Sequence, residues 1–237
     1  MLRFLFGILV LLLGSHIATA AAAETTPDVL ARTTTQEVLT LLKTDKEIQN
    51  GNLKKIYELV EAKVLPNFDF NRMTQLVVGK YWPGATPQQK QLLVSEFRNL
   101  LVRTYATSLT AFSNQSVDFK PFIMKPEDDD VTVKSEIKQP GGQPIRIDYS
   151  MYKTSFGWKV YDVTIDGVSL VTNYRASFAS TIRQSGIDGL IQTLTAKSQS
   201  KATVPNAADS PASAPAEAKP AAQKKTLAPA KPTVNRW

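Results

Sequence analysis

The chain has 237 residues, no cysteine and a single histidine, and its formal net charge is +7. That histidine, His16, lies near the N-terminus, so the rest of the chain cannot form a Ser-His-Asp triad, a Cys-His pair or a usual zinc site. Residues 201–237 contribute +4 and Arg3 contributes +1, which leaves +2 for residues 24–200. The nearly neutral charge of this domain does not indicate a basic face for duplex nucleic acid, and an enzyme would need Asp, Glu, Lys, Tyr or Ser-Lys chemistry.

The N-terminus has the pattern of a signal peptide. Residues 1–3 carry one positive charge, residues 4–13 are almost wholly apolar, and small residues offer cleavage sites after Ala20 or Ala23. The apolar run is shorter than the roughly 20 residues that a spanning helix needs, and without cysteine no lipoprotein anchor can form. We therefore expect residues 1–23 to be removed and the mature protein to be exported in soluble form.

The first half of the following domain is predicted to be helical. Apolar residues recur at spacings of three and four over residues 33–42 and 53–65, and Pro66 ends the second helix. Asp69 is a plausible N-cap for a short helix that Gly79 closes.

The clearest helix start in the chain is at Thr86. Pro87 stands at the first helical position and Gln89 stands three residues after Thr86, as in a capping box. A long amphipathic helix is expected from there to about Phe112.

The second half of the domain is predicted to form a sheet followed by helices. Alternation by two indicates four strands in meander order, which form one antiparallel sheet with one face free to pack on helices. Two closing helices are expected at about 170–184 and 187–196, with Gly186 between them. The four strands are expected at residues 117–123, 131–137, 145–151 and 158–165.

This order of elements predicts an α+β fold. We expect a curved four-stranded antiparallel meander sheet packed on helices, of the cystatin-like (NTF2-like) kind, with helices before and after the sheet and a cavity between the layers. The domain should span residues 24–200. Residues 201–237 are rich in Ala, Pro and Lys and lack the apolar side chains for a core, so we expect a disordered tail. It is either merely solvated or a tether to an anionic membrane surface or an acidic partner.

Two groups of segments resemble the periplasmic phospholipid-binding proteins of the Mla pathway, the MlaC or toluene-tolerance (Ttg2-type) family of Gram-negative bacteria. The first comprises residues 68–82, Thr86 and residues 97–105, and the second comprises residues 158–170, 173–175 and 186–190. The resemblance extends from about residue 28 to residue 196 and leaves out the C-terminal tail.

The resemblance implies a carrier and not an enzyme. Such proteins hold a phospholipid by its acyl chains and move it through the periplasm between an outer-membrane lipoprotein complex and an inner-membrane ABC-transporter complex, which maintains outer-membrane lipid asymmetry. It implies phospholipid as cargo, no cofactor and no metal, and only transient contact with the membrane complexes. We also expect no nucleic-acid partner, because the domain is nearly neutral, and a monomer.

The acyl pocket implied by the resemblance is expected between sheet and helices. The same apolar positions would also suit a plain packed core, because patterning cannot separate a solid core from a lipid-filled one. Arg175 is the candidate for the head-group phosphate, through bidentate hydrogen bonds; a surface ion pair is the alternative. The predicted pocket residues are Leu76, Phe97, Leu101, Tyr105, Leu109, Ile147, Tyr149, Val163, Ile165 and Tyr174.

Other functions stay open from the residues alone. Asp162, in the middle of a strand, could be the base of a small isomerase or hydrolase acting on a hydrophobic substrate, although a hydrogen-bonded structural role is the simpler interpretation. Asp128, Asp129 and Asp130 lack the ligand spacing of a calcium loop and indicate a solvated turn. Tyr81 and Trp82 could cap the core or touch a membrane. A pure adaptor without a ligand is the third possibility.

Overall fold

The computed structural model describes residues 25–111 and 115–199. The predicted signal peptide and the predicted tail lie outside these residues. Within the described part, no helix is both long enough and apolar enough to cross a bilayer. The helices are α1 (Pro27–Thr44), α2 (Lys46–Gln49), α3 (Leu53–Leu59), α4 (Phe70–Val78), α5 (Pro87–Ala106) and α6 (Leu170–Gln199), and the strands are β1 (Ser116–Phe119), β2 (Asp130–Lys138), β3 (Ile145–Thr154), β4 (Gly157–Ile165) and β5 (Val168–Ser169).

The sheet is an antiparallel meander in the order β1-β2-β3-β4-β5. The expectation of four strands was therefore wrong by one, because β5 follows β4 through a two-residue turn. Asp166 and Gly167 both have positive φ, at 48° and 88°, which is the backbone of the tightest hairpin turns. The short return strand is only two residues long, too short for alternation to reveal it.

A bulge interrupts β4 and changes which side chains point inward. Ser150 pairs with Asp162 and Met151 pairs with Val160, so Tyr161 has no partner residue on β3. As a result Val160 and Val163, three positions apart, are both buried. Strict alternation along the strand would have turned one of them outward, and the bulge also adds local twist.

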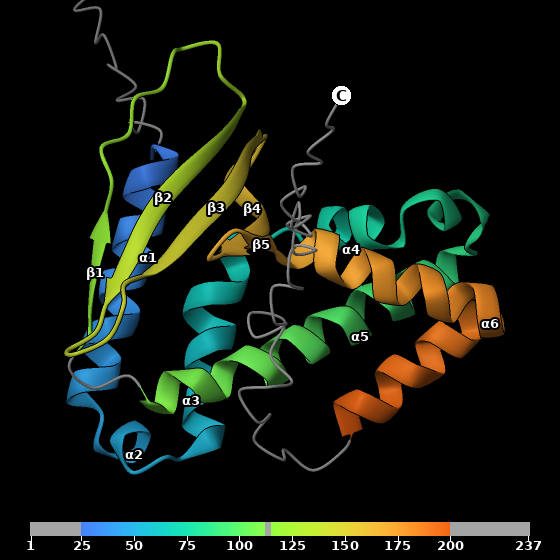
Figure 1. The fold of residues 1–237 in the computed structure, drawn as a ribbon, viewed down its shortest axis with the longest axis horizontal. Helices are drawn as coiled ribbons and strands as arrows, with labels where there is room; N and C mark the ends of the chain where they lie inside the picture. Colours follow the sequence, from blue (N-terminus) through green and yellow to red (C-terminus); the bar gives the residue numbers. More distant parts are fainter. Residues whose placement is uncertain (1–24, 112–114, 200–237) are drawn as a thin grey trace, which may run out of the picture.

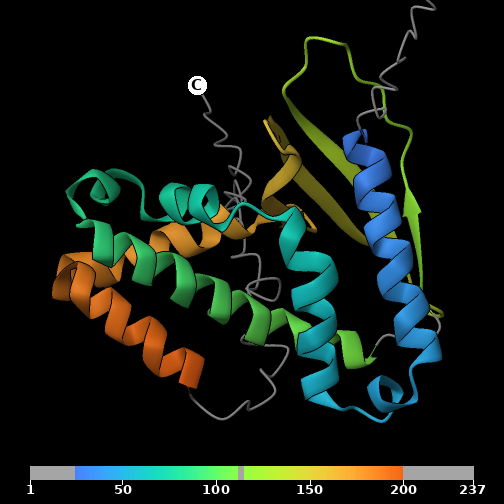
Figure 2. The same ribbon diagram turned by 180° about the vertical axis from the view of Figure 1, so that it is seen from behind.

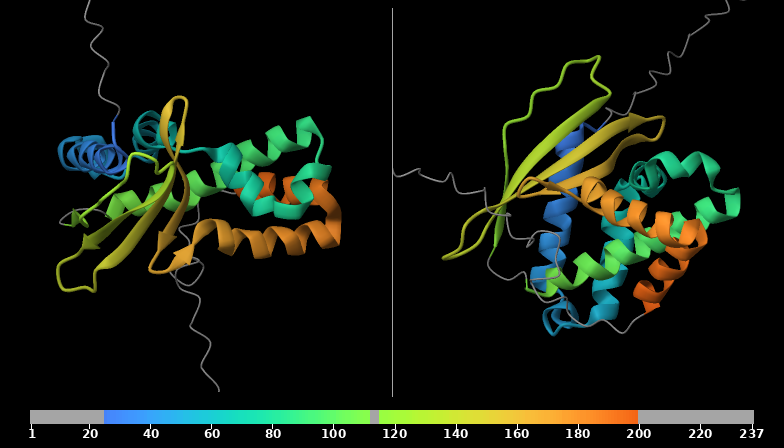
Figure 3. Two further views of the ribbon diagram at one scale, coloured as in Figure 1. Left: turned by 90° about the horizontal axis from the view of Figure 1, so that it is seen from above. Right: turned by 45° about the vertical axis from the view of Figure 1, so that its right-hand side comes forward.

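The helices form two groups around the sheet. Helix α1 lies across one face of the sheet over β1 and β2, with the helix that begins as α3 beside it (Figures 1 and 2). Helices α4, α5 and α6 pack together beyond the β4–β5 edge (Figure 3). The α+β class is confirmed, with helices before and after the sheet.

Several helix ends follow the sequence signals. Thr86 and Gln89 form the capping box at the start of α5, and the Asp69 side chain accepts the Arg72 N–H at the start of α4. Helix α1 begins at Pro27, earlier than expected, because proline suits the first turn.

The helix expected over 53–65 is not uniform. After α3 the chain widens into the π-helix η1 (Val60–Val64) and then tightens into the 3₁₀ turn η2 (Leu65–Asn67). Helix α5 likewise ends at Ala106 and continues as the 3₁₀ helix η4 (Thr107–Ala111). The 3.6-residue period of apolar residues does not reveal where an α-helix changes into a π-helix or a 3₁₀ helix.

The buried side chains form two clusters. The larger joins the sheet to α4, α5 and α6 and includes Met73, Phe97 and Met151, which are fully buried. The smaller joins α1, α2 and α3 around Ile56 and Leu42. Residues of both clusters face each other next to β3 and β4.

Candidate functional site

An apolar cavity of about 290 Å³ lies where the two clusters meet. Its walls are formed by strands β3 and β4 and, facing them, by α1, η1, α4, α5 and the segments that adjoin these helices. Its lining residues are Val38, Val60, Val64, Leu65, Phe68, Phe70, Met73, Leu101, Val102, Tyr105, Ala106, Leu109, Ile147, Tyr149, Val163, Ile165 and Leu170.

A second cavity, of about 240 Å³, adjoins the first beneath α1 and β1 to β3. Residues of both cavities overlap, because Phe68, Ile147 and Tyr149 line each of them, together with Val38, Val64 and Leu109. The two volumes are thus lobes of one hollow region, and each alone is below the roughly 300–1,000 Å³ of typical ligand pockets.

Most of the predicted pocket residues come together here. The strand positions and the last turns of α5 face the lobes as expected, which places the sequence-predicted residues Leu101, Tyr105, Leu109, Ile147, Tyr149, Val163 and Ile165 on their walls.

Leu76, Phe97 and Tyr174 do not line either lobe, and the structure places them in the layer between α4, α5 and α6. Phe97 is fully buried, and its ring meets those of Tyr174 and Phe178 edge to face at 5.3 Å. These three apolar or aromatic side chains pack against neighbouring helices and not against a hollow. A single helix stripe cannot show which part of it meets another helix and which part meets a hollow.

Sequence reasoning missed the walls supplied by α1 and by the segment 60–68. Val38 and Val64 belonged to recognised apolar stripes, and Phe68 began a segment of the family resemblance. The periodicity of these residues predicted that they are buried. It could not predict that they face the sheet, because that depends on how α1 and η1 pack across it.

No charged residue among the described ones lines either lobe. The polar groups on the walls are mostly hydroxyls that already have partners: the Tyr149 hydroxyl interacts with Ser135 and Thr35, and the Tyr105 hydroxyl interacts with Tyr174. Burial raises the pKa of Tyr105, Tyr149 and Tyr174 above the ordinary phenol value, so all three stay neutral at physiological pH. Such a surface suits hydrocarbon chains.

Asp162 has a complete set of structural partners. Its Oδ1 accepts the Val171 N–H at 3.1 Å and the Val163 N–H at 2.8 Å, and its Oδ2 accepts the Ser169 hydroxyl at 2.5 Å. The carboxylate thereby joins the bulged strand β4 to the first turn of α6, and it lines neither lobe. This is the structural role that the sequence offered as the simpler interpretation.

Arg175 lies away from both lobes, on the exposed side of α6. Its Nε donates to the Leu76 carbonyl at 2.9 Å, near the end of α4. A cation that satisfies a terminal helix carbonyl stabilises that helix end, and nothing in this geometry brings Arg175 to the mouth of the cavity.

The acidic turn and the aromatic pair also have local roles. The Asp128 carboxylate accepts the Lys125 N–H at 2.8 Å, and Asp130 accepts the Tyr161 hydroxyl at 2.8 Å. The described residues contain no cluster of acidic or histidine side chains suited to a metal ion. Tyr81 and Trp82 are half-buried and pack against the larger cluster.

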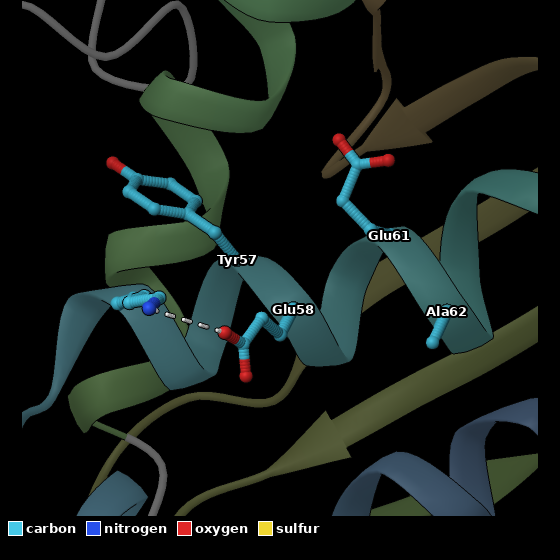
Figure 4. Close-up of a pocket in the computed structure, with 5 residues that line it drawn as sticks. Tyr57, Glu58, Glu61 and Ala62 are labelled. Carbon is cyan, nitrogen blue, oxygen red and sulfur yellow. Dashed lines mark ion pairs between the residues drawn. The ribbon is translucent and has the colours of Figure 1, made fainter.

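A further hollow, away from the two lobes, is more exposed than they are. It lies on the outer side of α3 and η1, about 630 Å³ in volume, and is lined by Lys54, Tyr57, Glu58, Glu61 and Ala62 (Figure 4). Two of these lining residues, Lys54 and Glu58, form an ion pair at 4.0 Å. With charged, exposed walls it offers hydrocarbon no shelter from water, so the enclosed lobes are the candidate binding site.

Known proteins are similar to this chain over most of its length. A family model described as MlaC protein matches residues 32–196. The toluene tolerance protein Ttg2D of Pseudomonas putida is 29% identical over 184 residues, which cover 77% of this chain and 84% of that protein. The intermembrane phospholipid transport system binding protein MlaC of Haemophilus influenzae is 26% identical over 190 residues, which cover 78% of this chain and 89% of that protein.

A solved structure shares the fold. The phospholipid-binding protein from Ralstonia solanacearum, determined in complex with a phospholipid, superposes with a TM-score of 0.69 at 38% sequence identity. The match covers 74% of this chain and 97% of that one. The stretch matched by the family model, residues 32–196, includes the whole sheet and most of the helices that enclose the lobes.

Proposed function

The chain belongs to the MlaC family, and on that premise we propose that it is a phospholipid-binding transport protein that holds acyl chains in the two-lobed cavity. The observation that carries the proposal is the cavity itself: it lies between sheet and helices and has no charged residue among its described lining residues. The phospholipid bound by the Ralstonia solanacearum protein, at 38% identity, supports the choice of ligand.

The energetics favour a carrier without chemistry. Exposing two acyl chains of about 15 methylenes each to water costs on the order of 24 kcal/mol, at ~0.8 kcal/mol per methylene. A dry cavity offsets most of this cost by shielding alone. A protein with this task needs no nucleophile, metal or cofactor, and the hydrogen-bonded Asp162 carboxylate supplies no free base.

Within this function we place the protein in the periplasm after removal of residues 1–23, as a monomer. Its proposed partners are an outer-membrane lipoprotein complex and an inner-membrane ABC-transporter complex, between which it would carry the lipid and so maintain outer-membrane asymmetry. This part of the proposal extends from the family resemblance.

Native mass spectrometry of the mature protein from a periplasmic extract tests the ligand. We expect a bound mass that lipid extraction identifies as a phospholipid and that is released only on unfolding. A protein that has its bare sequence mass and takes up no lipid from vesicles would contradict the proposal.

A cavity-filling variant tests the site. Ile147 lines both lobes, so Ile147→Trp should fill their junction and lower the lipid-bound fraction at least about tenfold while the overpacking costs roughly 1–3 kcal/mol of stability. Leu92→Trp is the matched control, because Leu92 is 40% exposed on α5. Equal lipid occupancy in the two folded variants would place the ligand elsewhere.

A further inference from the structure

Arg32 stands beside the second lobe, although its side chain does not line it. The residue lies on α1, and its neighbours Ala31, Thr34 and Thr35 are part of the wall of that lobe. Helix α1 passes close to β1 in this region (Figure 2). The Arg32 guanidinium carbon is 4.8 Å from the centre of the Phe119 ring, at the end of β1.

An aromatic stack connects this cation to the cavity. The Phe119 ring lies against the Tyr149 ring with 6.5 Å between centroids and 16° between planes, and Tyr149 lines both lobes. Val117, two residues before Phe119 on the same face of β1, lines the second lobe as well. Arg32 therefore lies at the rim of the hollow region, one ring removed from its interior.

The charge of Arg32 is not neutralised by an ion pair with any described residue. Asp28, one helical turn earlier, instead accepts the Thr26 hydroxyl at 2.7 Å. Three lysines of the surrounding segments do have carboxylate partners: Lys63 pairs with Glu37, Lys120 with Glu136 and Lys138 with Asp118. A half-buried guanidinium held on an aromatic ring keeps its N–H donors at its edge, where they can meet a planar or tetrahedral anion bidentately.

We propose that Arg32 binds the phosphate of the cargo lipid at the rim of the second lobe, while the acyl chains occupy the lobes. The inference rests on the proposed function and assigns to Arg32 the role that the sequence had suggested for Arg175. An apolar cavity with no charged residue among its described lining residues and with the Arg32 guanidinium at its rim matches an amphiphile with hydrocarbon chains and an anionic group.

Two lipids that differ only by the phosphate test this assignment. The delipidated mature protein is offered equal amounts of a phosphatidic acid and the diacylglycerol with the same two acyl chains, and native mass spectrometry measures the ratio of the bound species. We expect the wild type to favour the phosphatidic acid by roughly tenfold, the size of a charge-assisted hydrogen-bonded contact. Arg32→Gln should remove most of this preference and leave diacylglycerol uptake unchanged.

Two further variants serve as controls. Arg32→Lys keeps the charge but lacks the forked donors, so an intermediate preference is expected. Arg175→Gln should keep the full preference, because Arg175 is bonded to the Leu76 carbonyl. Thermal melting of each variant shows whether it is folded, and Arg32→Lys provides the test if Arg32→Gln is not.

The outcomes distinguish a failure of the carrier function from a failure of the Arg32 assignment. If the wild type takes up neither lipid, the carrier function itself fails. The assignment to Arg32 is overturned if lipid uptake persists and Arg32→Gln or Arg32→Lys keeps the full wild-type preference for phosphatidic acid. It is also overturned if Arg175→Gln loses that preference. In both cases the carrier function stands. Calorimetric titration with inorganic phosphate alone distinguishes a free-ion site: phosphate binding that depends on Arg32, without any preference between the lipids, would also overturn the proposal.

Discussion

Asp162 shows how one side chain can connect two elements of the fold. It lies where the bulge changes the inward-facing positions of β4, and both carboxylate oxygens are used by groups at the start of α6. The Ser169 hydroxyl that it accepts in turn accepts the Thr172 N–H at 3.0 Å, which caps the helix. A carboxylate near a helix N-terminus also interacts favourably with the helix dipole.

Replacement of Asp162 by alanine should therefore lower stability and leave lipid binding intact. We expect a loss of about 1–3 kcal/mol in the free energy of unfolding, because the variant leaves the Val171 N–H and the Ser169 hydroxyl without their acceptor. Denaturant titration measures the loss, with Ser169→Ala as the milder comparison. Unchanged stability together with a lost hydrolytic or isomerase activity would instead revive the enzyme hypothesis.

At the scale of elements, α6 is two helices joined at Gly186, as its glycine suggested. The residue has φ 71° and ψ −176°, a region that only glycine adopts readily. The change of direction brings the second part of α6 back along α5 (Figures 1 and 3). There Gln89 Nε2 donates to Asp188 at 2.7 Å and the Ser198 hydroxyl donates to Glu96 at 2.6 Å.

The conformation of Gly186 yields a test of this arrangement. Gly186→Ala should cost about 1–3 kcal/mol of unfolding free energy, because any Cβ is strained at this backbone position. Gly84→Ala is the matched control: its added Cβ would meet no atom within 4 Å and its φ is not in the left-handed region. Equal melting temperatures for the two variants would contradict the prediction that the kink in α6 requires glycine at position 186.

At the scale of the whole molecule, the core is divided by a cavity and has no disulfide to reinforce it. No described residue is a histidine, the usual side chain that titrates near neutral pH. The resolved shifts lie away from neutrality. Hydrogen bonding to Lys138 lowers the pKa of Asp118, and burial raises the pKa of Tyr105, Tyr149 and Tyr174.

Stability and lipid retention should therefore change little between about pH 6 and 8. A buried phenol with a raised pKa binds its proton more tightly in the folded state, so stability falls as the pH rises above the unfolded value of about 10. We expect Tyr105→Phe to reduce this alkaline loss. Melting temperatures across the pH range measure both effects; a transition near neutrality, or parallel alkaline curves for the two proteins, would contradict the prediction.

The local signals in the sequence were mostly sufficient for the helix starts and the strands. Thr86 with Gln89, Asp69, Gly79 and Gly186 lie where the structure caps or breaks its helices. Each of these signals acts through hydrogen bonds or backbone geometry within a few residues. Strand β5 and the bulge at Tyr161 were missed, because a two-residue strand and a single inserted residue leave no periodic pattern.

The sequence by itself determined the class of fold, the family and the apolar character of the site, since alternation, capping and composition are properties of neighbouring residues. Only the tertiary structure decided which apolar side chains enclose a hollow. It placed Phe97 and Tyr174 in a packed layer, Val38 and Phe68 on the cavity wall, and Arg32 instead of Arg175 at the rim. A hydrophobic residue follows the same pattern in both settings, and its neighbours across space depend on how distant segments pack.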